Sequence, residues 1–173
     1  MAWTTPKTWV AAEVVTAANM NTHIRDNLEV IDFFDHASWT PTLSATVTPP
    51  TLSDDASHEV VGRKLNVGDQ AWAWCHIKFG TSGTAAGDGT YQIATPWSAT
   101  SDYNLGTDGQ VIGSGRLYDN DLQDTTTVTW HLSSVDLVRA RYTSATIGLV
   151  THAAPHTWAD SDYLSFQWEY ETA

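Results

Sequence analysis

Residues 70–79 read Gln-Ala-Trp-Ala-Trp-Cys-His-Ile-Lys-Phe, and this stretch indicates the fold more clearly than any other. Its residues alternate in character, as expected of a β-strand, where successive side chains point to opposite faces. One face carries small or apolar residues, and the other carries Trp72, Trp74, His76 and Lys78. The pattern predicts a strand with one core-facing side and one mixed aromatic and polar side.

The same period of two recurs along the rest of the carboxy-terminal region. Near the end of the chain, Leu164, Phe166, Trp168 and Tyr170 alternate with polar residues, and further alternation covers 126–132 and 138–142. Strands are also expected near 42–48, 58–65 and 110–118, with a hairpin-type turn at Asp88-Gly89 before a strand at 91–93. The chain holds 25 Thr against 3 Lys, a bias that favours strands because Thr is branched at Cβ. We therefore predict a mainly β fold, an antiparallel β-sandwich with jelly-roll topology.

A helix is expected in the amino-terminal region. Thr16 is the predicted N-cap, and the helix should run to about residue 34. Apolar residues recur at helical spacing and form one narrow stripe: Ala17, Met20, Ile24, Leu28 and Ile31. Such a short helix needs a partner, either its own β-domain or other copies in a small parallel bundle. We favour the bundle, because the chain from Trp39 to Pro50 is typical of an exit into a separate domain. The predicted domains are therefore 1–38 and 39–173.

Composition narrows the functional classes. The chain has 173 residues and 20 acidic against 8 basic side chains, for a formal charge of -12. This balance argues against nucleic-acid and anionic-membrane binding, which require a basic surface. The amino terminus lacks the features of a signal peptide, and no run approaches 18 apolar residues, so we expect a protein made in a cytoplasm without membrane insertion.

The sequence offers no clear catalytic or metal-binding constellation. Cys75 is the only cysteine, and its position in the strand favours a buried, inert thiol. His152 and His156 have the spacing of a helical metal pair, but Pro155 lies between them. The acidic residues Asp119, Asp121 and Asp124 could hold calcium, yet they lack the EF-hand pattern, and acidic turns are common. We expect no enzyme activity, no cofactor and no bound metal.

The face that carries Trp72, Trp74 and His76 has three open interpretations. Subunit interfaces are enriched in Trp and Tyr, so the face could join copies of the chain. It could be covered by its own domain. It could also bind a carbohydrate, because the apolar face of a sugar stacks on an indole ring.

Two parts of the sequence resemble a family of small virion proteins from tailed phages. The first part comprises the runs Trp3-Thr-Thr-Pro-Lys-Thr-Trp-Val10, Glu13-Val-Val-Thr-Ala-Ala18 and Asn21-Thr-His-Ile-Arg-Asp-Asn-Leu28, which are similar to the amino-terminal segment of many minor tail or virion proteins. The second resembles the trimeric β-sandwich domain that follows such segments. Its matching pieces are 39–43, 70–82, 115–119, 157–162 and 169–171, with Trp72 and Trp74 at positions that are usually aliphatic.

The resemblance implies a non-enzymatic homotrimer that is made in the host cytoplasm and displayed on the virion surface. An anchoring segment containing Trp3, Pro6, Trp9, Val14 and Val15 would bind a capsid or tail protein, and the apolar stripe would form the trimer seam. A helix of this length spans about 27 Å, which favours capsid decoration or a short head fibre over a long tail fibre. The alternative is a tail-associated adsorption protein whose knob binds a host envelope glycan, and a glycan-cleaving enzyme is a third possibility.

Overall fold

The structure is a computed structural model that describes residues 5, 7–25, 37–53, 57–106, 109–143 and 147–173. The chain divides into two compact units, Met1–His36 and Ala37–Ala173. Among the described residues, no helix has the length and apolar character needed to cross a bilayer.

The described helical part of the first unit is short. Helix α1 (Ala17–Met20) continues directly into a π-helical turn, η1 (Asn21–Arg25). Thr16 has extended backbone angles, and its hydroxyl accepts a hydrogen bond from the amide of Asn19 at 3.2 Å. The predicted N-cap is therefore confirmed. The predicted helix beyond residue 25, with Leu28 and Ile31 of its stripe, lies outside the described residues.

The second unit is built from strands, which confirms the mainly β prediction; half of the chain is strand. Its described residues form a ten-stranded sheet. The strands are β1 (Ala37–Trp39), β2 (Leu43–Ala45), β3 (Glu59–Val67), β4 (Gln70–Lys78), β5 (Tyr91–Ala94), β6 (Val111–Asp119), β7 (Asp124–Ser134), β8 (Leu137–Thr143), β9 (Ile147–Leu149) and β10 (Tyr163–Glu171).

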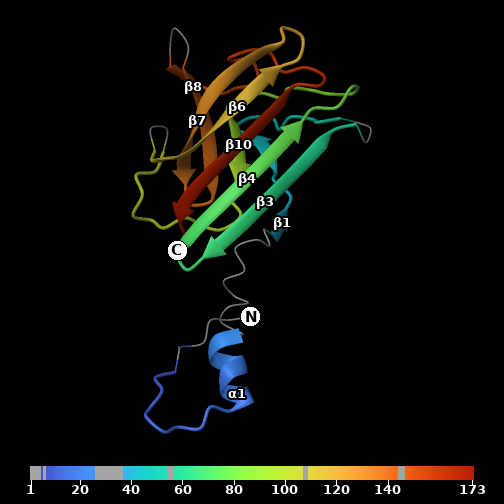
Figure 1. The fold of residues 1–173 in the computed structure, drawn as a ribbon. Coiled ribbons are helices and arrows are strands. Elements are labelled where there is room, and N and C mark those ends of the chain that lie inside the picture. Colours follow the sequence, from blue (N-terminus) through green and yellow to red (C-terminus); the bar gives the residue numbers. More distant parts are fainter. Residues whose placement is uncertain (1–4, 6, 26–36, 54–56, 107–108, 144–146) are drawn as a thin grey trace. The chain divides into compact units, whose positions relative to one another are not determined.

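All strand pairs are antiparallel, and hydrogen bonding runs continuously in the order β1-β3-β4-β10-β6-β7-β8-β5-β2. Strand β9 pairs with β8 beside β5, so β8 has two short neighbours along one edge. The sheet curls into a half-barrel, with the long strands β3, β4 and β10 side by side (Figure 1). The short strands β5 and β2 follow β8 at the other end of the sheet.

The hairpin predicted at Asp88-Gly89 is wrong. Strand β4 pairs with β3 and β10, whereas β5 pairs with β2 and β8, so β4 and β5 are not hydrogen-bonded neighbours. Gly87 and Gly89 have φ angles of +70° and +94°, and Asp88 forms an isolated β-bridge with Thr48. Glycine allows the positive φ angles on either side of Asp88, and the chain here pairs with Thr48, between β2 and β3, instead of folding back along β4.

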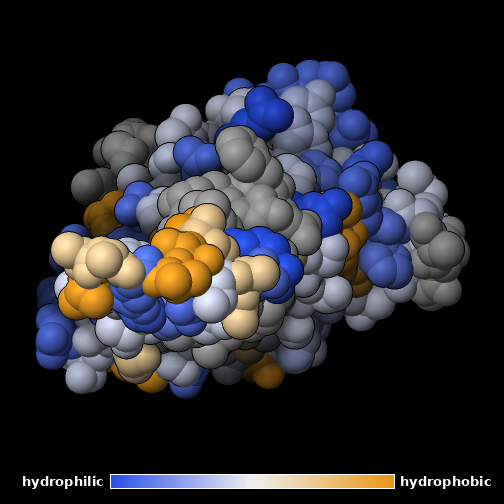
Figure 2. Space-filling view, turned by 60° about the horizontal axis from the view of Figure 1, so that its bottom comes forward, coloured by the Kyte–Doolittle hydropathy of each residue, from blue (hydrophilic) through white to orange (hydrophobic). Residues whose placement is uncertain are grey.

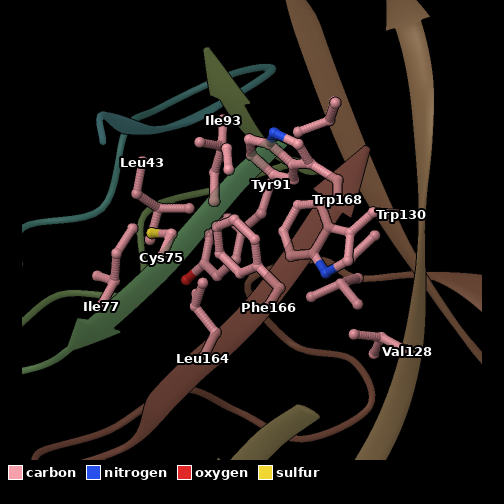
Figure 3. Packing of buried hydrophobic residues seen from close by; sticks show 14 of the residues in the cluster. Leu43, Cys75, Ile77, Tyr91, Ile93, Val128, Trp130, Leu164, Phe166 and Trp168 are labelled. Carbon is pink, nitrogen blue, oxygen red and sulfur yellow. The ribbon is translucent and has the colours of Figure 1, made fainter. Parts of the chain in front are cut away.

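The concave side of the curled sheet holds the hydrophobic core. The predicted inward residues of β4 and β10 are all buried: Ala71, Ala73, Cys75, Ile77, Leu164, Phe166, Trp168 and Tyr170. Figure 3 shows Leu43, Tyr91 and Ile93 near the buried residues of the long strands. Aromatic rings fill much of this space, with ring centres 4.3 Å apart for Trp130 and Phe166 and 4.7 Å apart for Phe166 and Trp168.

Two glycines on β6 make room for these rings. Gly113 lies between Trp130 of β7 and Trp168 of β10, and Gly115 lies between Val128 and Phe166. A Cβ at Gly113 would lie 2.7 Å from Trp168 Cβ, and one at Gly115 would lie 2.6 Å from Phe166 Cβ. With no side chain at Gly113 and Gly115, the rings of β7 and β10 meet across β6, with the centres of Trp130 and Trp168 5.8 Å apart.

We expect Gly115→Ala to destabilise the β-domain by about 1–3 kcal/mol, the usual cost of overpacking a core. The added methyl group would press on the Phe166 side chain and on the backbone carbonyl of Ser165, which cannot move without disturbing the strand. The free energy of unfolding in urea measures the effect. Ser114→Ala is the matched control, because Ser114 lies one residue away on the exposed face. Equal stability of the two variants would contradict the role assigned to the glycines.

Candidate functional site

The convex side of strands β3, β4, β10 and β6 carries the residues with the most distinctive chemistry. The strand registers place them in neighbouring cross-strand rows. We call this surface the outer aromatic face and define it by Trp72, Trp74 and His76 of β4, Tyr163 and Gln167 of β10, and Arg116 and Tyr118 of β6. In Figure 1, β3, β4 and β10 lie at the front, and no other strand of this unit crosses over them.

Trp74 is the most accessible aromatic residue of the outer aromatic face, with 43% of its surface exposed. It is paired with Arg63 of β3 on one side and with Gln167 of β10 on the other, and both are exposed. Trp72 is half-buried and lies between Leu65 and Glu169. The accessible Trp74 indole is therefore bordered by two exposed side chains, Arg63 and Gln167, that are able to form hydrogen bonds.

The adjoining part of the face is a packed cluster of rings. The rings of Tyr118 and Tyr163 are stacked with centres 4.8 Å apart, and the ring of His76 lies 5.2 Å from that of Tyr163. The Arg116 guanidinium carbon lies 5.8 Å from the centre of the Tyr163 ring, within the range of a cation–π contact. Each ring restricts the movement of the next, so the cluster holds its shape.

His76 is tied to the neighbouring strand, since its Nδ1 lies 2.6 Å from the hydroxyl oxygen of Ser165. Burial lowers the pKa of His76, the nearby Glu59 acts against this shift, and Lys78 and Arg116 add to it. The lowered pKa keeps the imidazole neutral at pH 7, because a protonated ring would lose solvation in this setting. His76 thus belongs to the face as an uncharged hydrogen-bonding ring.

Charges on this side of the sheet are balanced. The outward positions of β3, β4, β10 and β6 carry three cations, Arg63, Lys78 and Arg116, and three anions, Glu59, Glu169 and Glu171. The whole chain has a formal charge of -12. The face is therefore close to neutral on a strongly acidic protein.

The structure places the three residues predicted from the β4 alternation, Trp72, Trp74 and His76, on one face, opposite the buried Cys75. The sequence did not identify Tyr118, Tyr163 and Arg116 as their neighbours. Tyr118 and Arg116 are 40 or more positions along the chain from His76, and only the order β4-β10-β6 brings them together. No local pattern encodes that order.

The amino-terminal unit is a second candidate site, because it exposes apolar side chains. Among the predicted anchor residues, Trp9 is 37% exposed, Val14 77% and Val15 53%. Of the predicted seam, Ala17, Met20 and Ile24 are exposed as well. Trp3 and Pro6 lie outside the described residues. Hydrophobic residues, coloured orange, are visible at the surface in Figure 2.

A turn gives this exposed segment a defined shape. Lys7 and Glu13 form an ion pair, and a carboxylate oxygen of Glu13 accepts a hydrogen bond from the Val10 amide at 3.3 Å. The backbone of Glu13 donates to the Val10 carbonyl at 3.1 Å, and Ala12 adopts a φ of +66°. The hydrogen bond from Lys7 lowers the pKa of Glu13, so the pair is charged at neutral pH.

The weaker metal candidates have structural roles. Asp119 is buried, and its Oδ1 accepts hydrogen bonds from the amides of Asp121 and Leu122 at 3.0 and 2.9 Å, which holds the β6–β7 turn. His152 accepts from the Gly89 amide at 3.1 Å, and His156 lies 3.5 Å from Asp162. In the part of the chain that the structure describes, no group of three or more His, Cys, Asp or Glu residues could hold a metal ion.

Cys75 is fully buried, and burial raises the pKa of its thiol, so little of the nucleophilic thiolate forms at neutral pH. This agrees with the inert thiol expected from its strand position.

Comparison with known proteins found no likeness: no family model matches the chain, and neither a curated protein nor a solved structure matches it.

One buried carboxylate yields a prediction about stability. Asp162 is 1% exposed, and it accepts hydrogen bonds from the amides of Asn120 and Ala159 at 2.8 and 2.9 Å. Burial raises the pKa of Asp162, although these two amides act against the shift. The folded protein therefore holds this proton more tightly than the unfolded chain, so the contribution of Asp162 to the free energy of unfolding falls as the pH rises from about 4 through the raised pKa.

Asp162→Asn should remove this dependence, since an amide does not titrate. We expect the free energy of unfolding of the variant, relative to that of the unaltered protein, to be higher at pH 7 than at pH 4. Urea unfolding at both pH values measures this difference. Asp121→Asn controls for the loss of one negative charge, because Asp121 is exposed in the turn that Asp162 helps to hold. A stability difference that is the same at both pH values for Asp162→Asn would contradict the shift.

Proposed function

We propose that this chain is a non-enzymatic structural component of a tailed-phage virion. In this proposal it is a homotrimer made in the host cytoplasm, anchored to the particle by its amino-terminal segment, with a jelly-roll-like knob exposed on the virion surface. The resemblance of the runs within residues 3–28 to the amino-terminal segments of phage virion proteins suggests this class. The observation that carries the proposal is the two-unit organisation, in which a small amino-terminal unit exposes apolar side chains and a larger β-domain buries its own core.

The anchor is assigned to the turn that Lys7 and Glu13 hold together. Exposing Trp9, Val10, Val14 and Val15 to water is unfavourable, by about 25 cal/mol for each Å² of apolar surface. A site on a capsid or tail protein that covers these residues would recover this free energy. The ion pair and the turn fix the segment before binding, which reduces the entropy lost on docking.

Trimerisation is assigned to the helical segment that begins at Ala17. Met20 and Ile24 are exposed and four residues apart, so they lie on one side of the helix. The described helix is only a few residues long, and isolated helices of this length are unstable in water. Packing against the same helix of other copies would cover Met20 and Ile24 and stabilise this short helix.

The short helix and compact knob favour capsid decoration or a short head fibre. The alternative position is the tail, where the knob would take part in adsorption. Cryo-electron microscopy of the intact particle distinguishes the two positions, because threefold knobs would be seen over the icosahedral shell in the first case and only on the tail in the second. If the intact particle does not contain this protein at either position, the proposal is contradicted.

We expect Met20→Asp with Ile24→Asp to convert trimers into monomers, because charged groups would be buried in the seam at a cost of several kcal/mol per site. Multi-angle light scattering measures the mass. Thr22→Asp is the matched control, since it adds a charge on the opposite side of the same helix and should leave the mass unchanged. Trimers that persist in the double variant would remove the seam from the proposal.

We expect Trp9→Ala with Val14→Ala to leave folded trimers that no longer copurify with virions. Both side chains are exposed, and the Trp9 ring contacts Lys7 Nζ at 5.0 Å, while Lys7 keeps its ion pair with Glu13. Their loss should therefore affect docking more than folding. Thr8→Ala, at the exposed residue beside Trp9, is the control. The amount of protein per purified particle is the measurement, and normal incorporation of the double variant would refute the anchor.

A further inference from the structure

We propose that the outer aromatic face binds an uncharged polysaccharide, with the Trp74 indole as the stacking platform. Gln167 is the hydrogen-bonding group beside the indole, and Ser114 and Arg116 on β6 are hydrogen-bonding groups for the next sugar units. This inference goes beyond the structural role proposed above and does not require it. It rests on the accessibility of Trp74, the polar side chains that border it, the rigid ring cluster beside it and the charge balance of the face.

The arrangement around Trp74 provides the two kinds of contact that a sugar ring offers. Its indole is 43% exposed on the convex side of the sheet, so it can cover the apolar face of a pyranose. Gln167 lies directly opposite on β10, and Ser114 follows on β6. Side chains directly opposite in neighbouring strands are about 5 Å apart, so Gln167 reaches the hydroxyl groups of a sugar on the indole. Ser114 is one strand farther, about 10 Å from Trp74, and is within reach of the next sugar unit.

Arg116 lies in the next row of the face, two residues from Ser114. It lies across β10 from His76, so it is two strands, or about 10 Å, from β4 and would contact a sugar unit beyond the one on Trp74. It is exposed, lies over the Tyr163 ring and forms no ion pair with a carboxylate among the described residues. Its N–H groups therefore remain available to donate to ligand oxygens.

The cluster beside the platform is rigid before any ligand arrives. Tyr118 stacks on Tyr163, Tyr163 contacts His76, and His76 is hydrogen-bonded to Ser165. The Tyr118 hydroxyl donates to Gln123 at 2.7 Å, which fixes the end of the row. A surface whose side chains are already held loses less entropy on binding than a mobile one.

The balance of charges on the face favours an uncharged ligand. The three cations and three anions on this side of the sheet balance, whereas the chain as a whole carries a formal charge of -12. An anionic polymer would be repelled by the protein and would find no net positive surface to offset this repulsion. A second copy of the chain is a poorer occupant, because the centres of protein interfaces are depleted in charged residues, and here Arg63 lies beside Trp74 and Glu169 beside Trp72.

The test is isothermal titration of the full-length protein with defined oligosaccharides. The neutral probes are hexamers of N-acetylglucosamine (β1,4), glucose (α1,4 and β1,4) and mannose (β1,4), and the anionic probe is hexagalacturonate. We expect saturable binding of at least one neutral hexamer with a Kd below about 1 mM, and no binding of hexagalacturonate. Trp74→Ala should weaken binding by about tenfold or more, and Trp74→Phe should restore part of the affinity.

Val47→Ala is the matched control, because Val47 is an exposed apolar residue of the same unit that lies outside the outer aromatic face, and it should bind like the unaltered protein. Binding that does not depend on Trp74, binding of hexagalacturonate alone, or no binding of any neutral hexamer would overturn the proposal. Light scattering of Trp74→Ala tests whether the face instead joins copies of the chain, because a fall in oligomeric mass would assign the face to contacts between copies. An unchanged mass with lost binding supports the saccharide site, whatever the particle experiments show.

Discussion

The β-domain depends on the contact between aromatic rings across the glycines of β6. Gly113 and Gly115 leave the middle of the concave surface without side chains, and Trp130 from β7 and Phe166 and Trp168 from β10 occupy the space. The rings meet over β6 because Gly113 and Gly115 carry no side chains. A curled sheet needs small residues where its inner surface is most crowded, and these glycines supply them. The central strand of the sheet therefore has glycines where the neighbouring strands place their large aromatic side chains.

The same packing explains why the opposite side of the sheet is available for binding. Side chains alternate along β4, so the buried residues Ala73, Cys75 and Ile77 necessarily place Trp72, Trp74 and His76 on the convex side. The tightly filled core holds the strand backbones in position, and the backbones in turn fix the spacing of the outward residues. A face of this kind is rigid because it is built on strands.

The amino-terminal unit follows a different principle. Its local structure comes from short-range polar contacts, namely the Thr16 cap and the ion pair and turn between Lys7 and Glu13. These contacts shape the chain but cover little apolar surface, and Val10 and Val14 stay mostly exposed. A segment that is shaped but not buried is suited to binding another surface, as the proposed anchor and trimer seam require.

Local patterns in the sequence predicted the strands other than β1 and β9, the two faces of β4 and β10, and the Thr16 cap, because alternation and capping depend on residues within a few positions of each other. The sequence did not determine the order of the strands, and it predicted a hairpin at Asp88-Gly89 that the structure does not have. The tertiary structure decided which outward residues meet. Tyr163 and Tyr118 join His76 only because β10 lies between β4 and β6, and this pairing of distant segments depends on the packing of the whole core rather than on any local pattern.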